Sequence, residues 1–150
     1  MRLHPQRIWR HPRFWVFFAL FTVFTLSPIQ AISSEMCDRG GYELNSSINV
    51  IESKGGLWGY VEKVAELRDK SFLGLQADSS LKHLVVRFES LCENGKTPTP
   101  EMFVAIQDML SRARMIFNTP ADRMPTEKVI TLVTNIKHDA EKLLGSFPEA

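Results

Sequence analysis

The two cysteines are the residues of this chain whose chemistry is easiest to anticipate. Cys37 and Cys92 are the only cysteines in the sequence, and an even number of cysteines in an exported protein favours a disulfide bond. A bridge between them would close a loop of 56 residues, from 37 to 92. Such a bridge would stabilise the fold by about 4 kcal/mol in the loop-entropy model. The alternative is a pair of free thiols, with Cys92 packed on the apolar side of a helix.

The sequence has no motif typical of a catalytic or metal-binding site to accompany the cysteines. The sequence contains no Gly-x-Ser-x-Gly, glycine-rich phosphate loop or His-Glu-x-x-His motif. His83 and His138 are expected on polar helix faces, without a partner that would orient the second ring nitrogen. Glu62 and Glu66 have the spacing of a carboxylate pair on one helical face, but nearby lysines favour a solvated surface. We therefore expect neither catalysis nor a metal site.

Aromatic and methionine side chains suggest a binding surface instead. Trp58 stands among three glycines, and a large aromatic residue beside a flexible break is typical of a contact surface. Methionine adapts to irregular shapes, so Trp58, Tyr60, Met102 and Met109 are the candidate residues for binding a partner or ligand. The alternative role of these residues is core packing. The other aromatic and methionine residues that could line such a surface are Phe72, Phe88, Phe103, Met115 and Phe117.

The first 31 residues have the pattern of a secretory signal peptide. Four arginines precede an apolar run over residues 14–26, and Ser27-Pro28 and the small residue Ala31 follow it, so cleavage is expected before Ile32. The alternative is an uncleaved membrane anchor, but 13 residues fall short of the roughly 20 that a spanning helix needs. We expect a periplasmic or secreted protein without a membrane span after cleavage. The triplet Asn45-Ser46-Ser47 matches a glycosylation acceptor.

Charge and length describe a single small domain after cleavage. Removing 31 of the 150 residues leaves 119, over residues 32–150, which is enough for one modest core. All 17 acidic residues follow Ala31, whereas four of the 18 basic residues precede it, so the processed chain has a net charge of −3. Without a clustered basic face, nucleic acid is not an expected partner.

Apolar residues recur at helical spacing in five segments separated by glycine, proline or asparagine. The expected helices span residues 42–53, 57–72, 79–93 with Asp78 as N-cap, 100–118 after Thr99, and 126–144. Residues 32–41 are expected to be extended. The predicted fold class is all-α, a small bundle of four to five helices with one disulfide.

The glycine pair Gly55-Gly56 decides whether the proposed disulfide fits this bundle. The apolar stripes before and after the pair differ by more than a quarter turn, which predicts a break or sharp kink. If the chain only kinks there, the helix over residues 79–93 returns Cys92 to the end of the bundle that holds Cys37. If the chain reverses at the glycines, the cysteines lie at opposite ends, and a bridge would need the first segment to fold across the bundle. The kink is the favoured arrangement.

Two short segments resemble a known family of exported helical proteins. Residues 49–52, Asn-Val-Ile-Glu, and 64–68, Val-Ala-Glu-Leu-Arg, are similar to the first arm and turn of the periplasmic four-helix b-type cytochromes. That family holds haem between an early methionine and a late histidine. The resemblance implies a haem-binding electron carrier. The position that matches the early methionine falls near Gly41, so the ligands would be His138 and either Met102 or Met109, provided that His138 faces inward.

The function expected from the sequence is binding without catalysis. An exported helical bundle would engage a protein partner or a small apolar ligand and would need no cofactor. The haem-binding electron carrier is the alternative.

Overall fold

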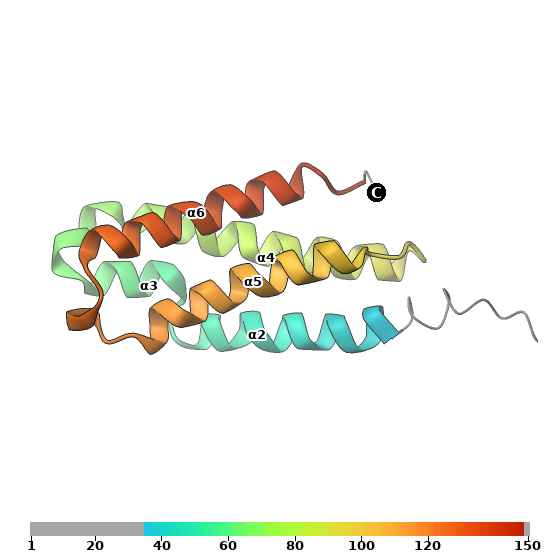
Figure 1. Ribbon diagram of the computed structural model, residues 1–150, viewed down its shortest axis with the longest axis horizontal. Helices are drawn as coiled ribbons and strands as arrows, with labels where there is room; N and C mark the ends of the chain where they lie inside the picture. Colours follow the sequence, from blue (N-terminus) through green and yellow to red (C-terminus); the bar gives the residue numbers. More distant parts are fainter. Residues whose placement is uncertain (1–34, 149–150) are drawn as a thin grey trace, which may run out of the picture.

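The chain from residue 35 to residue 148 folds into an all-α bundle in the computed structural model, which describes these residues (Figure 1). The predicted signal peptide lies outside the described residues. The helices are η1 (Met36–Gly40, a π-helix), α2 (Gly41–Ser53), α3 (Gly56–Lys63), η2 (Ala65–Lys70, 3-10), α4 (Ser71–Glu93), α5 (Pro100–Asn118), η3 (Ala121–Arg123, 3-10) and α6 (Thr126–Leu144). The predicted fold class is therefore confirmed.

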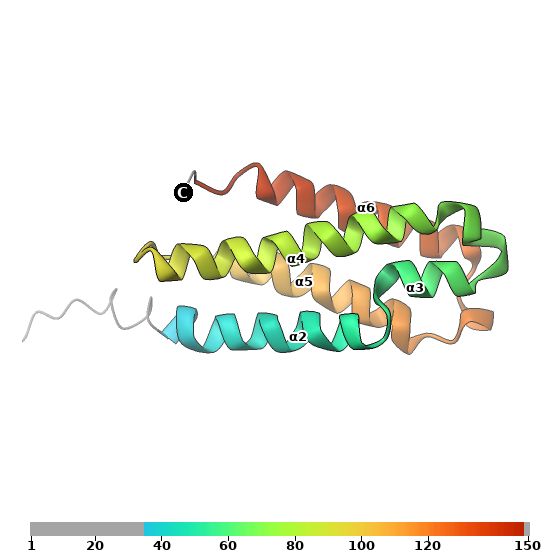
Figure 2. The same ribbon diagram turned by 180° about the vertical axis from the view of Figure 1, so that it is seen from behind.

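The main helices run up and down the long axis of the molecule. In Figures 1 and 2, α2 and α3 point in the same general direction, α4 runs back beside them, α5 reverses again and α6 returns alongside α4. Helix α4 contacts α2, α3, α5 and α6, so it is the element around which the others pack. Among the described residues, no helix is both long and apolar enough to cross a membrane.

The helical stripes read from the sequence form the core. Each main helix contributes buried residues at intervals of three or four, as expected when one apolar face packs inward. Phe88 of α4 is the largest side chain with no exposed surface. Phe147, beyond the end of α6, is also buried. The buried residues on these stripes include Leu44, Ile48, Ile51, Leu57, Val61, Leu81, Leu84, Ile106, Leu110, Val129, Val133 and Ile136.

Local signals located the last two helices correctly. Thr99 is the N-cap of α5, its Oγ1 accepting a 3.3 Å hydrogen bond from the backbone N–H of Met102, and Pro100 is the first helical residue. Hydrogen bonds from its own backbone N–H and from the Thr99 side chain lower the pKa of Glu101 and outweigh the smaller, opposite effect of desolvation. Helix α6 begins at Thr126 and ends at Leu144, as predicted.

The prediction of one helix over residues 57–72 is wrong, and so is the prediction that the next helix begins after Asp78. Helix α3 ends at Lys63, because Val64 is extended, and α4 begins at Ser71. Leu67 of η2 turns into the core, which lets the chain reverse here. Asp78 consequently lies inside α4 rather than at its start.

The expectation of an extended lead-in over residues 32–41 is also wrong for the part that the structure describes. Residues 36–40 form η1, which continues directly into α2. Gly40 is helical and buried, and a Cβ there would lie 3.1 Å from Cε2 of Phe103. The glycine permits close packing of η1 against α5, so its role is contact with a neighbour and not a break in the helix.

The glycine pair produces a kink, as predicted, and the disulfide follows from it. Gly55 and Gly56 have φ values of +92° and +69°, a region that costs other L-residues free energy. The chain shifts sideways between α2 and α3 but keeps its direction (Figure 1). Helix α4 therefore returns Cys92 to the end where η1 begins, and Cys37 and Cys92 form a disulfide with Cα atoms 5.6 Å apart.

Candidate functional site

The four residues proposed for a binding surface do not lie together. Trp58 and Tyr60 belong to α3, at one end of the bundle, whereas Met102 lies in the first turn of α5, towards the disulfide end (Figure 1). Trp58 is 41% exposed, and Tyr60 and Met102 are half-buried. Met109 is only 2% exposed and packs in the core. The partner or ligand role of these residues stays a prediction.

Asp78 of α4 fixes the start of α3. Its Oδ1 accepts a hydrogen bond from the backbone N–H of Leu57, and its Oδ2 accepts one from Trp58, both at 2.9 Å. The first N–H groups of a helix have no partner within the helix, so this carboxylate replaces a cap that the local sequence lacks. Partial burial raises the pKa of Asp78, the two hydrogen bonds lower it, and the negative charge of Glu52 raises it, with a net upward shift.

Close backbone packing holds α3 against α4. Gly74 of α4 faces the peptide between Leu57 and Trp58, where an added Cβ would lie 2.7 Å from both N and Cα of Trp58. On the other side of α3, the Tyr60 hydroxyl donates a 3.4 Å hydrogen bond to the Thr119 carbonyl. The Tyr60 ring also packs edge-on against Phe117 at 5.8 Å between centroids, and burial raises the pKa of its hydroxyl. Trp58 is therefore displayed from a well-anchored segment.

Three large apolar side chains are exposed on α3 and on the first part of α4, two helices that contact each other. Phe72 and Leu75 are three residues apart and share one side of α4, and they are 63% and 49% exposed. Leu75 follows Gly74, which lies against the backbone of Trp58. We call Trp58, Phe72 and Leu75 the α3–α4 surface. Trp58 and Phe72 are among the aromatic residues that the sequence suggested for binding, whereas no sequence pattern pointed to Leu75.

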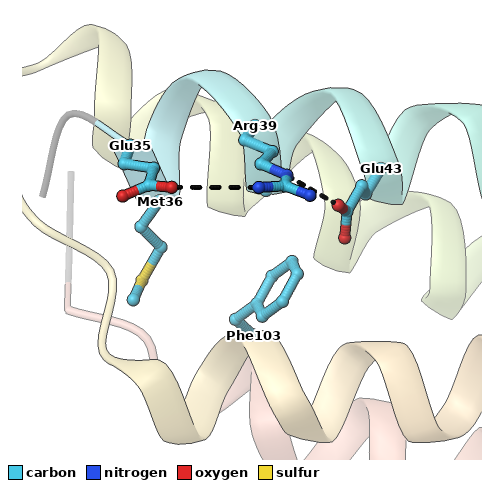
Figure 3. A pocket seen from close by; sticks show the side chains of 6 residues that line it. Glu35, Met36, Arg39, Glu43 and Phe103 are labelled. Carbon is cyan, nitrogen blue, oxygen red and sulfur yellow. Dashed lines mark ion pairs between the residues drawn. The ribbon is translucent and has the colours of Figure 1, made fainter. Parts of the chain in front are cut away.

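A small cavity lies at the opposite end, between η1 and the start of α5 (Figure 3). We call it the η1–α5 cavity. Its volume is about 290 Å³, and Glu35, Met36, Arg39, Gly40, Glu43 and Phe103 line it. Figure 3 shows the side chains of Met36 and Phe103 projecting into the space between the two helices, with Arg39 placed between the two carboxylates. Most of the lining is apolar.

Ion pairs order the rim of the η1–α5 cavity. Arg39 Nη1 lies 3.9 Å from Glu35 Oε1, and Arg39 Nε lies 3.3 Å from Glu43 Oε1. Gln107 of α5 donates a 3.2 Å hydrogen bond to Glu43 Oε2. The spacing of four between the charged residues could have indicated this row, but the expectation of an extended segment over residues 32–41 concealed it.

A second charged cluster connects α5 to α6. Arg112 is half-buried; its Nη2 donates a 2.8 Å hydrogen bond to Asp139 Oδ2 of α6. Its Nε lies 2.9 Å from Asp108 Oδ2, close enough for ionic attraction but not aligned for a hydrogen bond. The cluster joins α5 to α6, and both carboxylates are already paired with the Arg112 guanidinium, so we assign the cluster a structural role.

The residues with acid, base or ligand chemistry do not converge. His83 and His138 are both exposed, on α4 and α6. Glu62 lies in α3 and Glu66 in η2, so the extended residue between these helices removes the one-face spacing that the sequence suggested. Within residues 35–148, no group of three His, Cys, Asp or Glu residues could hold a metal ion.

The ligand pair implied by the cytochrome resemblance does not fit haem. A haem ligand on α6 would have to face the interior of the bundle, whereas His138 is exposed to solvent. Met102, at the start of α5, lies against the core edge. His138 and Met102 therefore do not face a shared interior space.

Asn45 is poorly placed as a glycosylation acceptor. It is half-buried in the middle of α2, and its side-chain Nδ2 donates a hydrogen bond to Glu89 of α4. Ser47, the third residue of the triplet, donates its hydroxyl to the Glu43 carbonyl and accepts from Arg114. Asn45 and Ser47 are thus each hydrogen-bonded to a residue of another helix.

Comparisons of this chain with protein-family models, with curated proteins and with solved structures found no match.

Proposed function

We propose that this protein is exported and acts by binding a protein partner through the α3–α4 surface, without catalysing a reaction. The observation that carries the proposal is that Phe72 and Leu75, which share one side of α4, and Trp58, on the neighbouring helix α3, are all more than 40% exposed. Single exposed apolar residues are normal on a protein surface, but grouped ones mark interaction sites. Tryptophan in particular is enriched among the residues that dominate binding energy.

The anchoring of α3 supports this role. A surface that is already fixed before binding loses less conformational entropy when the partner arrives. The Asp78 cap and the Gly74 contact hold the backbone of Trp58 in place, while its side chain stays accessible. The surface is thus prepared for a partner and is not a mobile loop that must first fold.

The disulfide supports the exported location. Disulfides persist in oxidising compartments and are rare in the cytosol, and the Cys37–Cys92 bridge closes the long separation between η1 and the end of α4. Together with the signal-peptide pattern of residues 1–31, it favours a periplasmic or secreted protein.

Photo-crosslinking from a single position tests the binding role. A photoreactive phenylalanine derivative placed at Phe72, in the full chain within its producing cells, is expected to yield a discrete heavier adduct with another protein. The same derivative at Val104, which is 61% exposed on α5, is the matched control and should not yield that adduct.

A second substitution connects the adduct to the α3–α4 surface. Leu75→Asp should abolish the Phe72 adduct, because a charge inside an apolar contact must be desolvated. Thermal unfolding should stay nearly unchanged, because Leu75 is about half exposed. Identical products at positions 72 and 104, or an adduct that survives Leu75→Asp, would contradict the proposal.

A further inference from the structure

We infer that the η1–α5 cavity is a second binding site, and that its ligand is a small amine with a short apolar group. This inference does not depend on the α3–α4 surface, which lies at the other end of the bundle. It rests on three features of the cavity: apolar walls, an excess of negative charge on the rim, and a disulfide that fixes the wall formed by η1.

The apolar walls of the cavity favour a ligand with a small apolar group. Met36 from η1 and Phe103 from α5 face the space from two helices (Figure 3). The Phe103 ring is held from behind by Phe88, with 6.0 Å between centroids. Gly40 adds no side chain, so its backbone packs closely against the Phe103 ring and completes this wall of the cavity. A volume of about 290 Å³ lies at the small end of the range for ligand pockets and suits a single ring or a short alkyl chain.

The rim selects the charge of the ligand. Glu35 and Glu43 contribute two carboxylates, and Arg39 contributes one guanidinium between them, so at neutral pH the rim has a net charge of −1. An ammonium would balance this charge, whereas an anionic ligand would approach two carboxylates. The face of an aromatic ring such as Phe103 also attracts a cation. The position of Arg39 in wild type shows that the rim accommodates positive charge.

The disulfide makes the cavity dependent on oxidation. Cys37 follows Met36 directly and precedes Arg39 and Gly40 on η1, and its bond to Cys92 fastens this short helix to the end of α4. Without the bridge, η1 would keep its chain connection to α2 but would lose its covalent attachment to α4. The ligand site is therefore expected only in the oxidised protein.

Three probes of similar size test the charge preference. The oxidised protein is titrated with 2-phenylethylamine, with neutral 2-phenylethanol and with anionic 3-phenylpropanoate, and the chemical shifts of the Met36 methyl group and the Phe103 ring are followed by NMR. The amine is expected to bind with a roughly millimolar Kd, as is usual for so few atoms. It should bind at least about fivefold more tightly than the alcohol, and the carboxylate should bind most weakly.

Two glycine variants test the location. In Gly40→Ala the new methyl group would lie 3.1 Å from Phe103 Cε2, so the ring must shift, which should disturb this wall of the cavity and weaken amine binding by about tenfold. Gly41→Ala is the matched control, because a Cβ there meets no atom within 4 Å, and it should leave the affinity unchanged. Circular dichroism establishes that both variants are folded.

Two charge variants test the rim and remain informative if Gly40→Ala does not fold. Glu43→Gln should weaken amine binding by about threefold to tenfold without changing alcohol binding. Arg39→Gln should strengthen amine binding by a similar factor, because it removes the competing cation. Equal binding of the three probes, no response to either charge variant, or amine binding that survives reduction of the disulfide would overturn the inference.

Discussion

Gly74 in α4 lies directly against the backbone of Trp58 in α3. A Cβ at position 74 would lie 2.7 Å from both the backbone nitrogen and the Cα of Trp58, closer than such atoms approach in proteins. The neighbouring atoms belong to backbone and not to a flexible side chain, so a larger residue could be accommodated only by moving the helix. The position of Trp58 on the surface thus depends on the absence of a side chain on α4.

Gly74→Ala is therefore expected to destabilise the fold, despite the higher helix propensity of alanine. Forcing a methyl group into this contact should lower the free energy of unfolding by about 1–3 kcal/mol, measured by urea denaturation. Gly59→Ala is the matched control in α3, because its Cβ would meet no atom within 4 Å. Alanine at position 59 should stabilise the protein by about 0.5–1 kcal/mol. Similar effects of the two substitutions would contradict the proposed packing.

The Asp78 cap predicts a second stability effect. Asp78→Ala removes the acceptors for the backbone N–H groups of Leu57 and Trp58 and should cost about 1 kcal/mol, as is typical for loss of a helix cap. Hydrogen exchange should accelerate at these two amides and much less in α6. Uniform acceleration along the chain would indicate global destabilisation and no specific capping role.

Asp78 also predicts how stability depends on pH. Burial raises its pKa above the ordinary value of 3.8 in the folded protein, so the folded state binds this proton more tightly than the unfolded state. The contribution of Asp78 to the free energy of unfolding should therefore increase as the pH falls through the raised folded pKa to below 3.8, and diminish as the pH rises.

A comparison with Asp78→Asn isolates this contribution, because asparagine keeps one acceptor oxygen and does not titrate. As the pH falls from 6 to 3, the free energy of unfolding of the wild type should increase relative to that of Asp78→Asn. A relative decrease would show that the two backbone hydrogen bonds outweigh desolvation and hold the pKa below its ordinary value.

The Cys37–Cys92 bridge predicts the largest single effect. Replacing both cysteines by serine should lower the free energy of unfolding by about 2–5 kcal/mol, because the bridge restricts the unfolded chain. The thermal midpoint should fall by about 10 °C or more. A reducing agent should produce the same decrease in the wild type and none in the double variant. An unchanged wild-type midpoint after complete reduction would show that the bridge adds no stability.

How well the sequence predicted each feature depended on how local its physical cause was. Thr99 and Pro100 act on the helix that they begin, so the start of α5 could be read from neighbouring residues. The apolar stripes likewise depend only on the sequence within each helix, and most of them form the core. Asp78 has the right chemistry for a cap, but it caps the start of α3, about 20 residues earlier in the chain. No local pattern identifies a partner at that distance.

The two candidate sites depend on tertiary contacts in the same way. Gly40 belongs to a segment that was expected to be extended, whereas the nearby Phe103 ring explains why glycine stands inside a helix. Trp58 was proposed as a contact residue, but the exposed Phe72 and Leu75 of α4 could be considered together with it only when α3 and α4 were placed side by side. Met109 was a candidate for binding, with core packing as the alternative. It is buried, so its place is in the core.

Mass spectrometry of the intact protein recovered from its producing cells tests the central claim, an exported and oxidised binding protein, most directly. The protein outside the cytosol is predicted to begin at Ile32 and to contain one Cys37–Cys92 disulfide. Recovery from the cytosol with Met1 retained and both thiols reduced would contradict the account.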